Sequence, residues 1–192
     1  MIGDSHTRDM DTAIKASHPN VEIMLVTKLR DINQITNHFM TSGFQPATAF
    51  NPTWIVIHCG HNDIVYHKLF NKNPQFARQV AIQQVQLALN IQTSFPHARV
   101  LCSRIYPRTA SDSSNLDPVN TAAYNRAAKR YGTRLRTLTT PHNIRCSMNN
   151  VLWRRISKTE EAADQFRADG LHLTENGKQR VGNEWIQVIT QP

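Results

Sequence analysis

The chain has 192 residues, of which 40% are hydrophobic and 19% charged, and it carries a formal charge of +8 at pH 7. This length suits one domain with a real hydrophobic core, and the composition excludes an intrinsically disordered chain. Neither a membrane-spanning apolar run nor a signal peptide is visible, so we expect a single cytoplasmic domain over residues 1–192.

Strand and helix patterns alternate from end to end. Short apolar runs predict buried strands at 21–26, 54–59, 99–105 and 143–146. Apolar residues at three- and four-residue spacing predict helices at 7–16, 31–40, 74–95, 119–138 and 174–189. Proline-bounded or Ser/Asp/Asn-rich stretches predict loops at 46–52 and 109–118. This alternation predicts a three-layer α/β/α domain with a mostly parallel sheet of about five strands.

The first strand of this sheet is expected to be truncated. A turn such as Gly3-Asp4-Ser5 normally follows a buried strand of about five residues in a parallel α/β protein. Here only Met1 and Ile2 precede the turn. Either the sequence is truncated just before this turn, or the edge of the sheet is incomplete.

Three polar stretches stand out, and two of them follow predicted strands. They are Gly3-Asp4-Ser5-His6, Gly60-His61-Asn62-Asp63 and Asp169-Gly170-Leu171-His172-Leu173. Ligands bind at the carboxyl ends of the strands in open α/β sheets, so the first two stretches should share one rim. The third feeds the last helix, which can pack back to that rim.

Together these stretches hold a candidate for every part of a nucleophilic site. Ser5 could be a nucleophile, His172 its base, Asp169 the group that orients the base, and Asn62 a donor to an oxyanion. Each residue also has an ordinary structural interpretation. Ser5 could cap the first helix, Asn62 could be a turn residue, and Asp169 and His172 could be a surface pair.

The three stretches, in this order, resemble blocks one, three and five of the SGNH hydrolases, also called the GDSL-like family. The resemblance implies a flavodoxin-like fold and a serine esterase without a cofactor. It implies that Ser5, His172 and Asp169 form the catalytic triad, and that the Ser5 N–H and Asn62 form the oxyanion hole. It also implies substrate-binding positions at Asp4, Gly60 and His61.

The chain departs from the family pattern in two places. The second block of the family supplies a glycine whose N–H is a further oxyanion donor, but Val26-Thr27-Lys28 stands there in this chain. The donor itself survives any residue except proline, whereas the close approach that glycine permits does not. Gly43 falls too late to replace it. His6 stands where the family name has leucine.

A metal site is not expected, although nine histidines are present. His58, His61 and His67 cluster with Cys59 and Asp63, but neighbouring strand residues point to opposite faces. No Cys-x-x-Cys or His-Glu-x-x-His spacing occurs.

The three cysteines are predicted to be reduced. Their odd number cannot pair completely, and two of them lie in apolar runs. They are Cys59, Cys102 and Cys146.

The pattern therefore predicts hydrolysis of small-molecule, carbohydrate or lipid esters, with short O-acyl groups such as acetyl first. The alternative is a catalytically weak or dead module of the same fold, of the kind that some retrotransposons encode, associated with nucleic acid. The basic charge, the missing second-block glycine and the truncated strand favour this alternative. The sequence predicts no oligomeric state.

Overall fold

The computed structural model describes residues 1–26, 31–42, 45–66, 75–109, 118–154 and 163–191, apart from the side chains of 5, 42, 46, 66 and 118–120. Its centre is a parallel sheet with the strand order β1-β2-β3-β4. The strands are β1 (Ile2–Gly3), β2 (Trp54–His58), β3 (Arg99–Ser103) and β4 (Arg145–Ser147).

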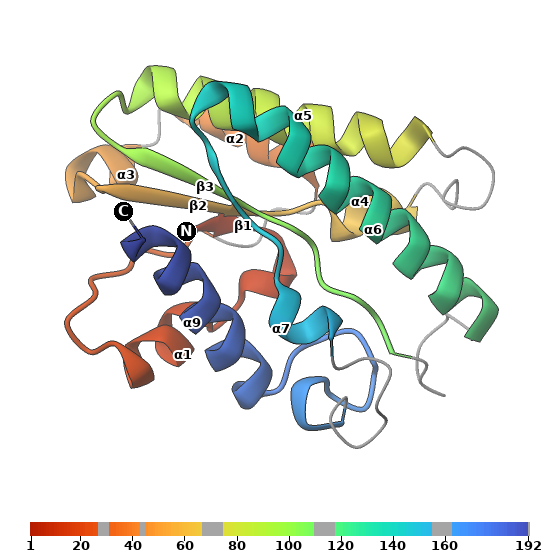
Figure 1. Cartoon of the computed structure of the whole chain (residues 1–192). Helices are drawn as coiled ribbons and strands as arrows, with labels where there is room; N and C mark the ends of the chain where they lie inside the picture. The colour runs from red at the N-terminus through yellow and green to blue at the C-terminus, as the bar shows by residue number, and fades with distance from the viewer. Residues whose placement is uncertain (27–30, 43–44, 67–74, 110–117, 155–162, 192) are drawn as a thin grey trace.

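Helices cover both faces of this sheet (Figure 1). One face carries α2 (Ile32–Ser42), α5 (Gln75–Ser94) and α6 (Pro118–Thr139). The other carries α1 (Met10–Ser17), α7 (Asn150–Trp153) and α9 (Glu175–Thr190). The predicted three-layer α/β/α architecture is confirmed. No helix in the described ranges is long and apolar enough to cross a membrane.

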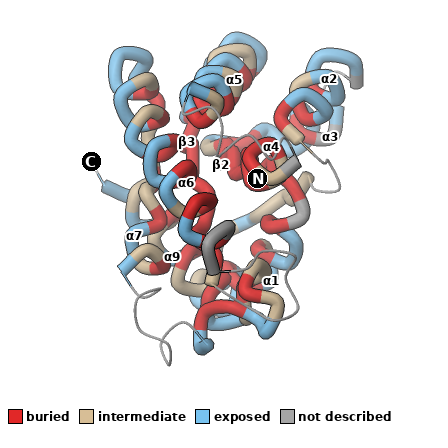
Figure 2. Tube along the Cα trace, turned by 90° about the vertical axis from the view of Figure 1, so that its right-hand side faces the viewer, coloured by how far each residue is buried: buried red, intermediate tan, exposed pale blue. Residues whose placement is uncertain are grey.

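The alternating side chains of the strands divide the hydrophobic core in two. Ile55 and Ile57 of β2 pack with the α2, α5 and α6 layer, whereas Val56 packs with α1 and α9. The helices turn their buried sides toward the sheet and their exposed sides outward (Figure 2). Burying one such apolar side chain contributes about 1.5–3 kcal/mol to folding.

The helix starts follow from polar caps. Asp31 Oδ1 accepts the N–H of Gln34 at 2.8 Å at the start of α2. Thr174 Oγ1 accepts the N–H of Gly177 at 3.1 Å at the start of α9. Each cap is worth about 1 kcal/mol.

The prediction of a strand over 21–26 is wrong. Only Val26 pairs, as an isolated parallel bridge to Ile2. Its N–H donates to Met1 O at 2.8 Å and its carbonyl accepts from Gly3 at 3.1 Å. The amino group of Met1 also donates to the Met24 carbonyl, but residues 21–25 form no ladder with β1, which has two residues.

The predicted loop at 46–52 also differs, because it contains the helix α3 (Gln45–Phe50). Of the predicted loop at 109–118, residues 110–117 lie outside the described residues.

An apolar cavity of about 270 Å³ lies at the amino-terminal end of the sheet. Its walls come from β1, β2, α3 and α9 and from the segment 21–26. It lies beside the first half of β2. Among its lining residues are Met24, Ala47, Trp54, Val56 and Ile189.

Candidate active site

The first two polar stretches lie side by side at the carboxyl end of the sheet. Gly3 pairs with His58 in the parallel register, so the residues that follow β1 and β2 emerge together. After β1 the chain enters a 3-10 turn over Ser5–Thr7. After β2 it passes Gly60, whose φ of 108° suits glycine, and begins α4 (His61–Tyr66).

Gly3 makes the tight turn after β1 possible. A Cβ atom there would lie 2.3 Å from Thr7 Cγ2 and 2.4 Å from the carbonyl oxygen of His58. The His58 carbonyl belongs to the neighbouring strand and cannot move aside. No side chain fits at this position, so the turn requires glycine.

Asp4 is fully buried and holds this turn together. Its Oδ1 accepts the N–H of His6 at 3.0 Å, and its carbonyl oxygen accepts the Thr7 N–H and hydroxyl. Burial raises the pKa of Asp4 to about 7, against the lowering effect of the backbone N–H of His6, and Asp63 raises it further. This burial disfavours the substrate contact that was predicted for Asp4.

The backbone of Ser5 lies in the first position of the 3-10 turn, directly after Asp4. Its side chain lies outside the described part of the structure. The role of Ser5 as nucleophile therefore stays a prediction, supported by its place at the rim.

The third stretch forms a compact acid–base loop. His172 Nδ1 lies 2.7 Å from Asp169 Oδ2, and Asp169 Oδ1 accepts the N–H groups of Leu171 and His172 at 2.9 Å each. Gly170 supplies a φ of 63°, and the Arg167 N–H closes the loop on the His172 carbonyl at 2.8 Å. The Asp169 and His172 side chains are 37% and 40% exposed.

The protonation of this pair follows from its hydrogen bonds. Partial burial pushes the pKa of Asp169 upward, but the bonds from the His172 ring and from the two backbone N–H groups outweigh it, and the pKa is lowered. Asp169 is thus a carboxylate and only accepts, so Nδ1 of His172 carries the hydrogen. The other ring nitrogen, Nε2, is left with its lone pair, as a general base requires.

Three stacked imidazoles bring the three stretches together. The ring centroid of His6 lies 3.8 Å from that of His61 and 5.2 Å from that of His172, with interplanar angles of 21° and 19°. Each ring comes from a different stretch, and His6 is the neighbour of Ser5. The predicted meeting of these distant segments is therefore present in the structure.

His61 is buried and neutral, and both of its ring nitrogens are engaged. Nε2 accepts the N–H of Tyr106 at 3.1 Å, so Nδ1 carries the hydrogen toward Tyr124 Oη at 2.8 Å. Burial, followed by the charges of His6 and His58, lowers the pKa of His61 well below its usual value. His61 therefore supports the stack, and its burial disfavours the predicted substrate contact.

His6 is also held neutral. It is 6% exposed, and burial together with the charges of His58 and His172 lowers its pKa well below the usual value. Within the described part of the chain, its Nδ1 has no hydrogen-bond partner. A neutral ring against His172 adds no charge that would compete with an imidazolium there.

A buried polar network below the stack was missed by sequence reasoning. Ser103 Oγ lies 3.0 Å from each of His58 Nδ1, Asn149 Nδ2 and Trp185 Nε1. Trp185 Nε1 also donates to Asn149 Oδ1 at 3.1 Å. Burial lowers the pKa of His58 to about 3, although its bond to Ser103 raises it. The only signal in the sequence was a polar residue inside each of two apolar strand runs.

The remaining predicted residues lie near the rim. Asn62 is half-buried in the first turn of α4, next to His61. Asp63 has another task, because its carboxylate accepts the N–H of Ile32 at the start of α2. The second-block positions Thr27 and Lys28, and Gly43, lie outside the described residues.

The described histidines, cysteines and carboxylates do not form a metal site. Within them, no group of three or more His, Cys, Asp or Glu side chains could hold a metal ion; His67 lies outside them. Cys59, Cys102 and Cys146 are free thiols, as predicted.

Solved structures with the same fold cover nearly the whole chain. An acetyl xylan esterase named AlAXEase has a TM-score of 0.67 and 16% identity, covering 98% of both chains. A catalytic mutant of an acetylxylan esterase from Geobacillus stearothermophilus has a TM-score of 0.68 and 14% identity, covering all of this chain and 93% of that one. A GDSL-like lipase from Bacteroides thetaiotaomicron VPI-5482 has a TM-score of 0.65 and 14% identity, covering 98% and 85%. At these identities the similarity establishes the fold.

A comparison with curated protein sequences found no match. The sequence profile of the GDSL-like Lipase/Acylhydrolase family, in contrast, matches residues 1–180. This match includes all three polar stretches that the fold gathers at one rim. The chain belongs to the GDSL-like Lipase/Acylhydrolase family and is a hydrolase of ester bonds.

Proposed function

We propose that the protein hydrolyses carboxylic esters with short acyl groups, acetyl first, through Ser5, His172 and Asp169. The Ser5 N–H and the Asn62 side chain act as donors to the oxyanion. Acetyl is the first choice because two structures of the same fold bear the names of acetylxylan esterases.

The observation that carries this proposal is the Asp169–His172 pair and its place beside His6. A carboxylate 2.7 Å from Nδ1 leaves Nε2 as the basic nitrogen. The stack with His6 sets the ring of His172 next to the residue that follows Ser5. An oriented base next to a serine at a strand end is the arrangement that acyl transfer needs.

The reaction then runs in two halves. Nε2 of His172 takes the Ser5 hydroxyl proton as Oγ bonds to the acyl carbon, and the oxyanion donors hold the negative charge. The bond between the acyl carbon and the ester oxygen breaks, and the alcohol leaves with the proton from His172. Water then attacks the acyl-enzyme by the same route, releasing the acid and restoring Ser5.

The test compares Ser5→Ala with the matched surface variant Ser94→Ala, whose hydroxyl only bonds Asn90 of its own helix. With p-nitrophenyl acetate we expect Ser5→Ala to lose about 10³-fold or more in kcat and Ser94→Ala to lose none. A fluorophosphonate probe should label the wild type and Ser94→Ala but not Ser5→Ala. A folded Ser5→Ala protein with wild-type turnover would remove Ser5 from the mechanism.

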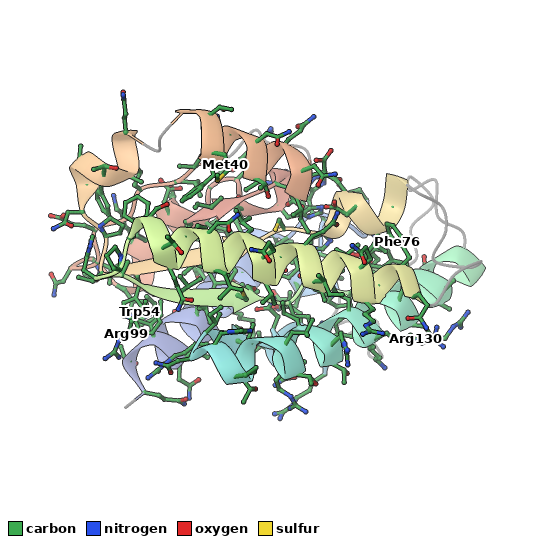
Figure 3. The ribbon with its side chains drawn as sticks, turned by 90° about the horizontal axis from the view of Figure 1, so that it is seen from above. Met40, Trp54, Phe76, Arg99 and Arg130 are labelled. Atoms are coloured by element: carbon green, nitrogen blue, oxygen red, sulfur yellow. The ribbon has the colours of Figure 1, made fainter. Side chains whose placement is uncertain are left out.

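A second candidate function, binding to nucleic acid, is favoured by the segregation of charge. The described residues between 75 and 154 carry no Asp or Glu side chain. Figure 3 views the molecule from the side that α5 and α6 cover, and it labels Arg130 of α6. The eleven cations of these ranges are Arg78, Arg99, Arg104, Arg108, Arg126, Lys129, Arg130, Arg134, Arg136, Arg145 and Arg154.

Binding of a polyanion by the exposed cations of this region would depend steeply on salt concentration. Arg126→Glu with Arg130→Glu reverses two exposed charges on α6, and Lys15→Glu on α1 is the control from the opposite layer. We expect fluorescence anisotropy of a single-stranded RNA to rise with protein in 50 mM salt, to fall in 200 mM salt, and to be lost in the double variant only. No binding by the wild type in 50 mM salt would exclude this function.

A further inference from the structure

A second cavity, of about 260 Å³, lies beside His172. Its wall differs from that of the apolar cavity, because most of the side chains that line it are charged or polar. His6 and His172 line it together, so it begins where the reacting groups of the proposed esterase lie. The other lining residues are Arg8, Asp9, Arg167, Leu173 and Lys178.

The cations of this cavity outnumber its carboxylates. Lys178 is compensated, because its Nζ lies 3.3 Å from Asp9 Oδ2 and 3.6 Å from Glu175 Oε2, with the side chain 8% exposed. Arg8 and Arg167 are exposed, and neither forms an ion pair with a described carboxylate. Two guanidinium groups therefore have no countercharge among the described residues.

Arg167 is held in place by the acid–base loop itself. Its N–H donates to the His172 carbonyl at 2.8 Å, and its Nε donates to the Leu173 carbonyl at 3.2 Å. These bonds occupy the main chain and Nε and leave the Nη donors for a ligand. The planar donor fork of arginine matches carboxylate and phosphate oxygens, and its position is coupled to that of the base.

The charged wall of this cavity favours an anionic substrate group over a long acyl chain. A long acyl chain placed here would strip water from charged groups and return no hydrogen bonds, which is costly. An anionic group would exchange that water for charge-assisted hydrogen bonds.

We propose that this cavity binds a carboxylate or phosphate group on the alcohol part of the ester, with Arg8 and Arg167 as its ligands. This inference rests on the proposed esterase function. The preferred substrate is then a short-chain ester of an alcohol that carries a negative charge, and the two guanidinium groups set this preference.

The kinetic test uses three acetyl esters: phenyl acetate, 4-acetoxybenzoate and 4-acetoxyphenyl phosphate. The decisive quantity is kcat/KM for an anionic ester divided by that for phenyl acetate, compared between proteins so that intrinsic reactivity cancels. We expect this ratio to fall about tenfold in Arg8→Gln and in Arg167→Gln. Arg180→Gln should keep the wild-type ratio, because Arg180 pairs with Asp164. The two anionic esters distinguish carboxylate from phosphate.

A binding measurement separates this inference from the esterase proposal. Calorimetry of 4-hydroxybenzoate and of 4-hydroxyphenyl phosphate with Ser5→Ala needs no turnover, and adding Arg8→Gln should weaken binding about tenfold. If no ester is hydrolysed but this arginine-dependent binding is found, the cavity stands and the esterase proposal fails. Hydrolysis with an unchanged ratio in both arginine variants, or no binding of either anion, would overturn the anion site.

Discussion

At the scale of single residues, Asp169 sets which nitrogen of His172 is basic. Its two oxygens have separate tasks, since Oδ2 faces the imidazole and Oδ1 accepts two backbone N–H groups. An asparagine could keep the backbone bonds through its oxygen and would then present an NH₂ group to Nδ1. The hydrogen of the ring would have to move to Nε2, where it blocks the base.

We therefore expect Asp169→Asn to fold normally and to lose about 10³–10⁴-fold in kcat. The measurement is steady-state hydrolysis of p-nitrophenyl acetate, with far-UV circular dichroism as a check of the fold. Asp11→Asn on α1 serves as the control, and it should retain full activity. An Asp169→Asn enzyme with kcat within a few-fold of wild type would refute the orienting role.

His6 is expected to position His172 through its ring plane. His6→Ala removes the ring against which His172 stacks. We expect kcat to fall about tenfold and KM to change less, because a poorly positioned base weakens the stabilisation of the transition state more than the binding of the substrate. His6→Phe keeps a flat ring and should restore most of kcat. If Phe restored nothing while both variants were folded, the stack would have no positioning role.

The candidate pair Asp169 and His172 could be predicted because the two residues are close in the sequence. Asp169 and His172 are three residues apart, and the glycine between them permits the turn. The network of His58, Ser103 and Asn149 could not be predicted in this way. Its members come from two strands and a loop, and only the tertiary structure shows that one serine hydroxyl serves all of them.

At the scale of elements, the long helices were predictable, whereas the short helix α3 and the sheet edge were not. The apolar periodicity of the long helices follows from one buried face, and their caps from single side chains. The segment 21–26 has the composition of a strand, but a strand needs a neighbour of its own length. The neighbouring strand β1 has two residues, so the strand-like composition of 21–26 led to a wrong prediction.

The apolar cavity at this edge predicts a stabilising substitution. Ala47 of α3 is 7% exposed and lines the cavity, so Ala47→Leu adds apolar volume without displacing a polar group. We expect the free energy of unfolding to rise by about 0.5–2 kcal/mol in urea titrations. Ala49→Leu is the matched control, because Ala49 lies exposed on the same helix and should gain nothing. A loss of stability in Ala47→Leu would show that the cavity cannot accept the added volume.

At the scale of the whole molecule, buried titratable groups make stability depend on pH. The pKa values of His6, His58 and His61 are all lowered by burial, so the unfolded chain binds up to three more protons once the pH falls below about 6.5. Stability from these groups is complete above that pH and is lost on acidification. Asp4 acts in the opposite sense: its raised pKa of about 7 means that the fold gains stability as the pH falls from 7 toward 4.

On unfolding, the three histidines bind up to three protons and Asp4 releases one, so the net uptake is about two protons. We therefore expect the free energy of unfolding to fall by up to about 3 kcal/mol per pH unit between pH 6.5 and 5, measured by urea titration. In Asp4→Asn the opposing group is gone, and the slope should steepen to about 4 kcal/mol per unit. A flat profile in the wild type would mean that the imidazoles are charged in the folded protein.

The compactness of the acid–base loop has a consequence for how this enzyme can fail. All hydrogen bonds that hold His172 to Asp169 are formed within residues 167–172, whereas Ser5 reaches the rim on a two-residue strand. Damage at the amino end would thus displace Ser5, the proposed nucleophile, while leaving the Asp169–His172 pair assembled. Proton NMR can follow this, because the hydrogen shared between Nδ1 and a carboxylate 2.7 Å away should give a resonance far downfield. That signal should persist in an inactive protein whose first turn is displaced, since the hydrogen bonds between Asp169 and His172 involve no atom of residues 1–7.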